Sequence, residues 1–353
     1  MLFNIEKDEG NRIVGYLVPD SFSKSPSLRI TDGNRDLLIL PCQEERAALV
    51  FAGRHSTGQC GFTIDETIIA DLSRREALEL YDNETNILIY RRRPQVIQKR
   101  IFRLETHLVP LWRLDDSLDS HFQYYHKGIE RHGRETATQV FMLNASTSLY
   151  LSGRLLFKTY ESYINETFNC IALLRDPFME LAERLLALKL VRRFPETSQL
   201  LDARDMLSYT PAIDFAEAMG SDERQIHRAF ATMPKAAIAN FANPVTRQLA
   251  ARTPDEAPTK GAVATALETL STFAVVGLRE GQDLFLAQFA NLLGISAESL
   301  PVLPEFNQAT KLCELLKRVP EVELLIEQDL EIYHHVKSAL ENALGKLGAA
   351  EIS

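Results

Sequence analysis

Short apolar segments separated by turn residues fill the first quarter of the chain, and this pattern predicts β-strands. Strands are expected at residues 13–18, 27–30, 37–40, 61–64, 78–81 and 86–90. The Asp32-Gly33 pair between two of these segments is typical of a hairpin turn. Short strands at regular spacing with turns between them favour a small β-sandwich or barrel.

After about residue 93 the period changes to that of helices alternating with isolated apolar strands. Helices are expected at residues 96–108, 118–131, 149–164 and 178–194, and strands at residues 139–143, 170–174 and 273–277. Such alternation is typical of βαβ units and a parallel sheet. The stretch of about 196–262 is polar and helical, with an exposed loop at 253–261, and residues 309–347 are helical with a break near Pro320.

These patterns predict an α/β fold with three parts. A β-sandwich-like accessory domain spans residues 1–85, and a parallel sheet flanked by helices spans residues 86–310 with a helical insertion at about 196–262. Residues 311–353 form a helical C-terminal extension that packs on the α/β domain. A chain of 353 residues is long for one compact domain, which agrees with a division into parts.

Composition narrows the classes of partner. The net charge of −9 argues against a general nucleic-acid binder. No apolar run approaches the roughly 20 residues of a membrane span, and the first residues lack the basic-then-apolar order of a signal peptide, so we expect a cytoplasmic protein. The cysteines are scattered without Cys-x-x-Cys spacing, which predicts buried reduced thiols: Cys42, Cys60, Cys170 and Cys313.

The segment with the clearest chemistry begins at the predicted strand 170–174. That strand runs directly into Arg175-Asp176-Pro177 and then into a helix, and Pro177 suits a first helical position. Arg175 is therefore expected at the carboxyl end of a strand beside a helix N-terminus, where open α/β sheets bind anions. Glu180 and Glu183 follow on the same helix and would repel an anion.

Four segments, taken in order over roughly residues 86–340, resemble motifs of the P-loop-like sulfotransferases, especially the branch that acts on carbohydrates. Arg175-Asp176-Pro177 resembles their 3′-phosphate motif, and residues 243–249 (Asn-Pro-Val-Thr-Arg-Gln-Leu) resemble their Asn-x-x-Thr-Arg-x-Leu segment. Residues 266–280, ending in Gly-Leu-Arg-Glu, and residues 325–333 resemble the segments that follow. The resemblance implies a P-loop-like fold, the sulfuryl donor PAPS as co-substrate, and Arg175 and Arg247 as donor-binding residues.

In that family a glycine- and hydroxyl-rich loop between the first strand and helix binds the 5′-phosphosulfate of the donor. The corresponding position here, within residues 87–100, has neither glycine nor hydroxyls but is strongly basic. Arginine and lysine side chains could hold the phosphosulfate by charge instead. We expect this role for Arg91, Arg92, Arg93, Lys99 and Arg100, the alternative being a solvated basic rim at a domain junction.

A second departure lies eight residues after Arg175, where the family has a phosphate-binding serine and this chain has Glu183. A carboxylate close to a phosphate would cost several kcal/mol unless it were protonated or paired. Arg184 and Lys189 are the expected partners of Glu183.

Sulfuryl transfer also needs a base for the acceptor hydroxyl. Glu105 and His107, expected on the first helix after the basic loop, are the candidates, although a half-buried helix histidine is the commoner role for His107. Asn144 and Ser146 end a predicted strand at a point where a site residue would be expected. A helix N-cap cluster is their alternative role.

Two further patterns have less specific meanings. The segment 53–61 lacks the Gly-Lys-Ser/Thr of a phosphate loop and leads into a strand, and together with Ile13-Val-Gly-Tyr16 it loosely resembles an accessory β-domain of bacterial glycan-modifying transferases. The spacings of His121, His126 and His132 do not suit metal ligation on one helix face, so no metal site is predicted.

Two functions follow as expectations. The first is a sulfotransferase-like enzyme that transfers a sulfuryl group from PAPS to a bacterial saccharide or glycolipid. The second is a catalytically inactive relative that serves as a binding or assembly protein in a surface-polysaccharide system, as the missing loop and Glu183 indicate. A salt bridge of Glu183 across the phosphate position would favour the second.

Overall fold

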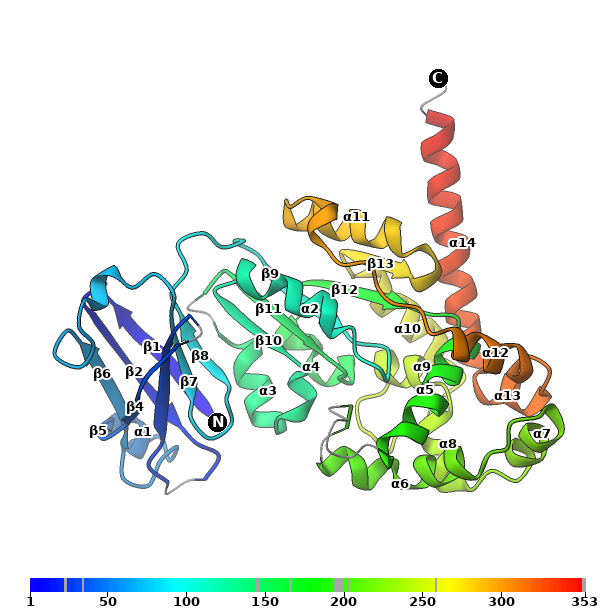
Figure 1. The fold of residues 1–353 in the computed structure, drawn as a ribbon, viewed down its shortest axis with the longest axis horizontal. Coiled ribbons are helices and arrows are strands. Elements are labelled where there is room, and N and C mark those ends of the chain that lie inside the picture. Colours follow the sequence, from blue (N-terminus) through cyan, green and yellow to red (C-terminus); the bar gives the residue numbers. More distant parts are fainter. Residues whose placement is uncertain are drawn as a thin grey trace. The chain divides into compact units, whose positions relative to one another are not determined.

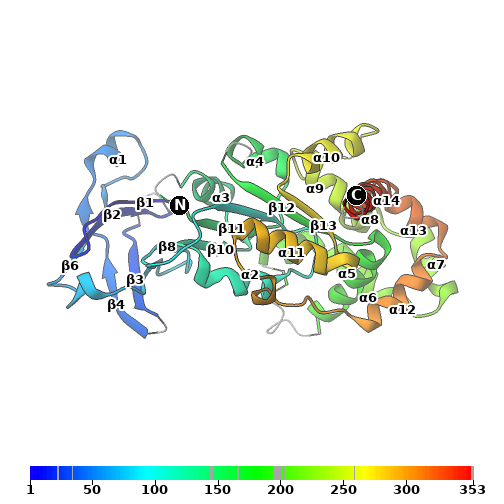
Figure 2. The ribbon, with the colours of Figure 1, turned by 90° about the horizontal axis from the view of Figure 1, so that it is seen from above.

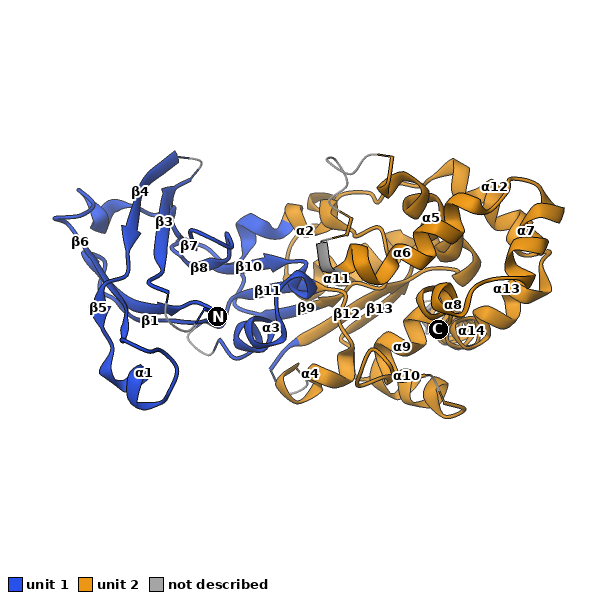
Figure 3. Cartoon of the chain, turned by 90° about the horizontal axis from the view of Figure 1, so that it is seen from below, with its two compact units in different colours: residues 1–102, 118–152, 166–168 blue, residues 103–117, 153–165, 169–353 orange. Residues whose placement is uncertain are grey.

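The chain divides into two compact units. The computed structural model describes residues 1–21, 24–33, 35–143, 146–164, 167–193, 200–201, 203–257 and 259–350. Unit 1 comprises residues 1–102, 118–152 and 166–168, and unit 2 comprises residues 103–117, 153–165 and 169–353 (Figure 3). Both units are discontinuous in sequence, whereas the sequence pattern indicated consecutive domains.

Unit 1 contains two four-stranded antiparallel sheets, in the strand orders β1-β2-β6-β5 and β4-β3-β7-β8 (Figure 1). Every strand predicted in this region is present, and β1, which the pattern did not indicate, pairs with β2. The strands are β1 (Leu2–Asp8), β2 (Arg12–Val18), β3 (Ser27–Asp32), β4 (Arg35–Pro41), β5 (Glu44–Glu45), β6 (Gln59–Asp65), β7 (Leu78–Asp82) and β8 (Leu88–Arg91).

Alternating burial explains why these segments are strands. In β3, for example, Leu28 and Ile30 are fully buried while Arg29 between them is only partly covered. The predicted hairpin turn joins β3 to β4, and Gly33 adopts a φ of +59°, a left-handed conformation that favours glycine. The antiparallel part of the predicted fold is therefore confirmed.

A five-stranded parallel sheet follows, in the order β10-β11-β9-β12-β13. Its strands are β9 (Arg100–Leu104), β10 (Tyr124–Lys127), β11 (Leu149–Gly153), β12 (Asn169–Leu174) and β13 (Val275–Leu278). Helices flank the sheet on both faces, as Figure 2 and Figure 3 show for α10 (Ala262–Ser271) and α11 (Gln282–Leu293) beside β13. Gly277 allows α11 to pack closely, because an added Cβ would lie 2.6 Å from the Cβ of Phe285. A parallel sheet flanked by helices was predicted and is confirmed.

The first parallel strand lies where the pattern predicted a helix at residues 96–108. Ile101, Leu104 and Leu108 have helical spacing, but residues 101–105 are all buried, which requires a strand covered on both faces. The apolar run was not recognised as a strand because it contains Arg103, whose charge is balanced inside the fold by Glu105 and Asp115. The helix prediction was therefore wrong, and the strand β9 begins at Arg100.

Three neighbouring predictions also need correction. Residues 118–131 do not form one helix but contain β10 between two short 3₁₀ helices, and residues 149–164 divide into β11 and the helix α4 (Phe157–Ile164). The predicted strand at 139–143 lies largely in the helix α3 (Arg134–Phe141). Its buried residues, Thr136, Ala137, Val140 and Phe141, have helical spacing, so a helix face outweighs the β-propensity of Val140 and Phe141.

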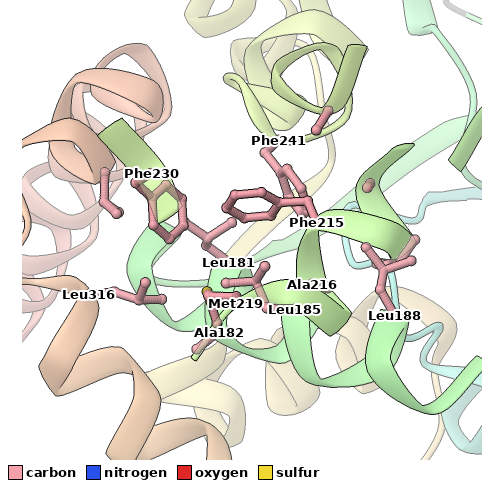
Figure 4. Packing of buried hydrophobic residues seen from close by; sticks show 14 of the residues in the cluster. Leu181, Ala182, Leu185, Leu188, Phe215, Ala216, Met219, Phe230, Phe241 and Leu316 are labelled. Carbon is pink, nitrogen blue, oxygen red and sulfur yellow. The ribbon is translucent and has the colours of Figure 1, made fainter. Parts of the chain in front are cut away.

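Unit 2 is mainly helical. Figure 4 shows its buried apolar cluster, in which Leu181 and Leu185 of α5 pack with Phe215, Phe230 and residues of the surrounding helices. These helices are α5 (Pro177–Val191), α6 (Ala203–Ala218), α7 (Glu223–Ala231), α8 (Lys235–Phe241), α9 (Pro244–Ala250), α12 (Asn307–Leu316), α13 (Pro320–Leu325) and α14 (Glu327–Ala350). The predicted helical character of residues 196–262 and of the C-terminal region, with its break at Pro320, is confirmed for the described residues.

Short helices complete the structure. They are α1 (Ala47–Phe51), α2 (Trp112–Leu118) and the 3₁₀ helices η1 (Leu72–Arg74), η2 (Asp119–His121), η3 (Ile129–Arg131), η4 (Arg279–Gly281) and η5 (Ala297–Ser299). Among the described helices, none is long and apolar enough to cross a membrane. All four cysteines are buried with free thiols, as the sequence predicts.

Candidate functional site

The strand order places a topological switch point at the carboxyl ends of β9 and β12. From β9 the chain adds β10 and β11 on one side of the sheet, and then β12 and β13 on the other. Ligands of open α/β sheets bind in the crevice outside such a point. The residues that follow the two strands are Glu105 and Arg175, and the Thr106 hydroxyl donates to the Leu173 carbonyl oxygen at 2.8 Å. The candidate site therefore lies within unit 2.

Arg175 lies where the sequence predicted, at the end of β12. The Asp176 carboxylate caps α5 by accepting from the backbone N–H groups of Phe178 and Met179, and Pro177 occupies the first turn. This local chemistry explains why the strand and the start of the helix were recognisable from sequence. The Arg175 side chain is buried, and its Nη2 atom lies 3.0 Å from Oε1 of Glu183.

Glu183 thus pairs with the guanidinium of Arg175, for which the sequence indicated a phosphate as partner. Its partner is neither Arg184 nor Lys189 as predicted, because Arg184 contacts Glu180 and Lys189 donates to the Met219 carbonyl oxygen. Burial raises the pKa of Glu183 to about 7, and the attraction of Arg175 only partly offsets that effect. The position where the resemblance implies a phosphate is therefore filled by a carboxylate that titrates near neutral pH.

Arg279 is a buried residue of this cluster that sequence reasoning missed. It follows β13, is 4% exposed, and donates from Nη2 to the Pro304 carbonyl oxygen, while its Nε and Nη1 atoms have no hydrogen-bond partner. Burial and then the charge of Arg175 lower its pKa. The available signal was an arginine directly after an apolar strand, the same pattern that singled out Arg175.

Glu105 and His107 do meet at the site, but on the loop between β9 and α2 rather than on a helix. Oε1 of Glu105 accepts from the backbone N–H of His107 at 3.1 Å and lies 3.1 Å from its Nδ1. Oε2 accepts from the Leu111 N–H at 2.7 Å and from Arg103 at 2.9 Å. Burial alone would raise the pKa of Glu105, but Arg103 and His107 together hold it below its ordinary value.

This arrangement suits a structural carboxylate better than a general base. Both oxygens of Glu105 already accept two contacts each, so neither has room for a substrate hydroxyl. His107 differs, because its Nε2 atom is buried without a hydrogen-bond partner. Of the two candidate bases, His107 therefore has an atom, Nε2, that could accept a proton from a substrate, whereas both oxygens of Glu105 are already engaged.

Two spaces adjoin the cluster. A small cavity of about 20 Å³ is lined by Thr106, Arg175, Glu180 and Asp329 among others, which is room for about one water molecule. An open cleft of about 630 Å³ lies beside α5, and Glu183 lines it. Only the cleft has the size of a small-molecule site.

The other arginines predicted to bind the donor lie in unit 1. Arg91 ends β8, and its Nε atom lies 2.6 Å from Glu79, whose carboxylate is also 3.3 Å from Arg93. Arg92 forms an ion pair with Asp8 at 2.5 Å. The expected strand is present as β8, but it belongs to an antiparallel sheet, and residues 92–99 after it form no helix. These side chains are held by carboxylates of their own unit.

The remaining predicted residues have structural contacts. Arg100 starts β9, donates to the Phe141 carbonyl oxygen at 2.8 Å and stacks on Phe168, and Lys99 precedes it. Arg247 of α9 donates to the backbone carbonyl oxygens of Ala239 and Pro254.

The loop before β11 has a turn structure. Ser146 donates to the side chain of Gln123 and to the Ser148 carbonyl oxygen, both at 3.1 Å, and also accepts from the Ser148 N–H. These contacts are those of a loop-stabilising serine rather than of a site residue. Asn144 lies outside the described residues.

Two of the motifs that carry the family resemblance contact each other. The Asn243 side chain accepts from the N–H groups of Gln328 and Asp329, and the Asp329 carboxylate accepts from the N–H groups of Val245 and Thr246. Each residue thereby caps the first turn of the other's helix, α9 or α14. Gln248 of α9 also donates to the Glu105 carbonyl oxygen at 2.7 Å. The contacts position the site without adding a free functional group.

Within the described part of the chain, no group of three His, Cys, Asp or Glu side chains is arranged to hold a metal ion. Comparison of the chain with known protein families, with curated proteins and with solved structures found no match.

Proposed function

We propose that this protein is a sulfotransferase-like binding or assembly protein that does not transfer a sulfuryl group from PAPS. The observation that carries the proposal is the contact of 3.0 Å between Arg175 and Glu183. In the family that the motifs resemble, this arginine holds the 3′-phosphate of the donor. Here a carboxylate from the same chain takes that place, and a phosphate would have to displace it against charge repulsion.

Two further features support a binding role. The cavity beside Arg175 holds about 20 Å³, far less than a nucleotide occupies. Glu105, one of the two candidate bases, is fully engaged by Arg103, His107 and Leu111. The sequence hypothesis of a role in a surface-polysaccharide system, with a saccharide or glycolipid as ligand, is retained as part of the proposal.

Titration with PAP, the desulfated donor, tests this function. The wild-type protein should show no binding heat and no thermal stabilisation at millimolar PAP. Glu183→Ser removes the competing carboxylate and introduces the hydroxyl that the family uses, so this variant should gain measurable affinity for PAP. The gain should be lost again when Arg175→Ala is added.

Glu268→Gln, an exposed position on α10, is the matched control and should behave as wild type. Stabilisation of the wild-type protein by PAP that disappears in Arg175→Ala would overturn the proposal. So would release of PAP from PAPS in the presence of a saccharide acceptor.

A further inference from the structure

Arg279 is a buried cation without a carboxylate partner. Among the described residues, no carboxylate oxygen lies within 4.0 Å of its guanidinium, and two of its three nitrogens have no hydrogen-bond partner. An unpaired buried charge is costly, and natural structures rarely keep one without a counter-ion. Arg279 is therefore a buried cation with which an anion from outside the chain could pair.

Arg175 lies close enough to Arg279 for their charges to repel. Its single ion-pair partner among the described residues is Glu183, and its Nε atom is buried without a hydrogen-bond partner. Within ion-pair distance the two guanidiniums thus share one carboxylate, while Glu305 and Glu105 act on Arg279 from farther away. Glu180 does not pair with either guanidinium, because its own contacts are to Arg184 and to the N–H of Leu108.

The open cleft is lined by Glu183, which contacts Arg175, but by neither arginine itself. Arg279 donates to the carbonyl oxygen of Pro304, and the next residue, Glu305, also lines the cleft. Rotation of the Glu183 side chain toward solvent would open a path from the cleft to Arg175. Glu183 therefore lies between the open cleft and the buried Arg175.

The cleft walls are apolar. They include Val109, Pro110, Trp112, Leu186, Leu190 and Phe306. Among the described residues that line the cleft, the charged ones are Glu183 and the exposed Glu305. A ligand that fills this space must present an apolar body to the walls.

We propose that the cleft binds an amphipathic anion, whose apolar body lies against Trp112, Leu186 and Leu190 and whose oxyanion head displaces Glu183 from Arg175 and pairs with Arg175 and Arg279. A phosphate, sulfate or carboxylate head shares this chemistry, since a guanidinium fork binds each of them through two oxygens. The proposal names the ligand class for the binding role given above and rests on that role.

Octyl phosphate is a suitable probe, and Trp112 reports on it because it is the only tryptophan in the chain. Titration of the full-length protein should change the Trp112 fluorescence and protect it from acrylamide quenching. Affinity should rise along the series from inorganic phosphate through butyl to octyl phosphate, by about tenfold or more and at most roughly 200-fold between the last two, because the octyl chain buries up to four more methylenes. Octylamine, which has the same chain but a cationic head, should bind at least about tenfold more weakly than octyl phosphate.

Variants separate the head from the body. Arg279→Gln should weaken octyl phosphate by about tenfold or more, and Glu183→Gln should strengthen it, because the competing negative charge is removed. Arg192→Gln, an exposed arginine at the C-cap of α5, is the matched control and should change nothing. Octyl glucoside and octanoate complete the set, and octanoate should bind while octyl glucoside should not.

Several outcomes would overturn the inference. Equal affinity for octyl phosphate and octylamine would exclude recognition of the head, and equal affinity for octyl phosphate and inorganic phosphate would exclude the cleft. Both comparisons use the unmodified protein, so they remain decisive even where a variant fails to fold. Binding of PAP by the wild-type protein would overturn the proposed function instead, so the two failures can be distinguished.

Discussion

Arg103 and Asp115 form a fully buried bidentate ion pair, with Nε 2.8 Å from Oδ1 and Nη2 2.7 Å from Oδ2. The pair joins the carboxyl end of β9 to α2, and Arg103 also reaches Glu105. Removal of Asp115 takes away both bidentate contacts and one of the carboxylates that balance the buried guanidinium, which is a costly way to disrupt such a pair. The loop that carries Glu105 and His107 is thereby fixed from both ends.

We therefore expect Asp115→Ala to reduce the free energy of unfolding by about 3–5 kcal/mol, measured by urea denaturation. Asp116→Ala, at the exposed neighbouring position, is the control and should cost less than about 1 kcal/mol. Equal losses in the two variants would contradict a role for the buried pair.

The pH dependence of stability should carry a contribution from Glu183. Its pKa is about 7 in the folded protein against 4.5 ordinarily, so the folded state binds more protons than the unfolded state between these values. The free energy of unfolding should then fall as the pH rises from 4.5 to 7, by about 3 kcal/mol at roughly 1.4 kcal/mol for each pH unit.

Glu183→Gln should remove this contribution, and urea denaturation at pH 5 and pH 8 is the measurement. The groups that face Glu183 are Arg175, Glu180, His107 and Arg279, and they are unchanged in the variant. If the difference between the two pH values is as large in Glu183→Gln as in the wild-type protein, the titrating group is another one.

The sequence predicted the Arg175 end of the site because all of its signals are local. An apolar run, a capping aspartate and a proline at the first helical turn lie within eight residues. It failed at β9 because Arg103 is buried by partners that lie elsewhere, on α2 and on the next loop. A charged residue inside a strand could be recognised only by knowing those partners.

The same limit applies to charges within the site. The sequence offered Arg184 and Lys189, basic residues farther along the same helix, as partners of Glu183. The observed partner is Arg175, outside the helix, while Arg184 takes Glu180 at i−4. The direction in which Arg175 points, which decides whether it is free for a ligand, depends on tertiary packing that no local pattern shows.

A second pH effect should come from unit 1, where Nε2 of His126 lies 2.8 Å from Nε2 of His132. Burial, followed by the charges of His132 and Arg131, lowers the pKa of His126 to about 3 from 6.5. The unfolded state therefore binds more protons between these values. Stability should fall as the pH drops from 6.5 toward 3, by an amount on the order of 5 kcal/mol.

His126→Gln keeps a polar group at this position but cannot take a proton, so its stability should be less sensitive to acid than that of the wild-type protein. His334→Gln, on the exposed side of α14, is the matched control. The slope is opposite in sign to that of Glu183, so each variant must be compared with the wild-type protein over the same pH range. An unchanged acid limb in His126→Gln would contradict the prediction.

Asn243 and Asp329 provide the last prediction, because each caps the first turn of the other's helix. The Asp329 carboxylate accepts from the N–H of Thr246 at 2.7 Å, from its hydroxyl at 2.6 Å and from the N–H of Val245 at 3.1 Å, all in a buried environment. Asp329→Ala would leave three donors without a partner, and we expect a loss of about 3 kcal/mol in the free energy of unfolding. Glu327→Ala, exposed in the same turn of α14, should cost less than about 1 kcal/mol.

Because α9 also holds the Glu105 loop through Gln248, Asp329→Ala should raise the acrylamide quenching of Trp112, whereas Glu327→Ala should not. A destabilised variant with unchanged quenching would show that the caps stabilise α9 and α14 but do not position the site.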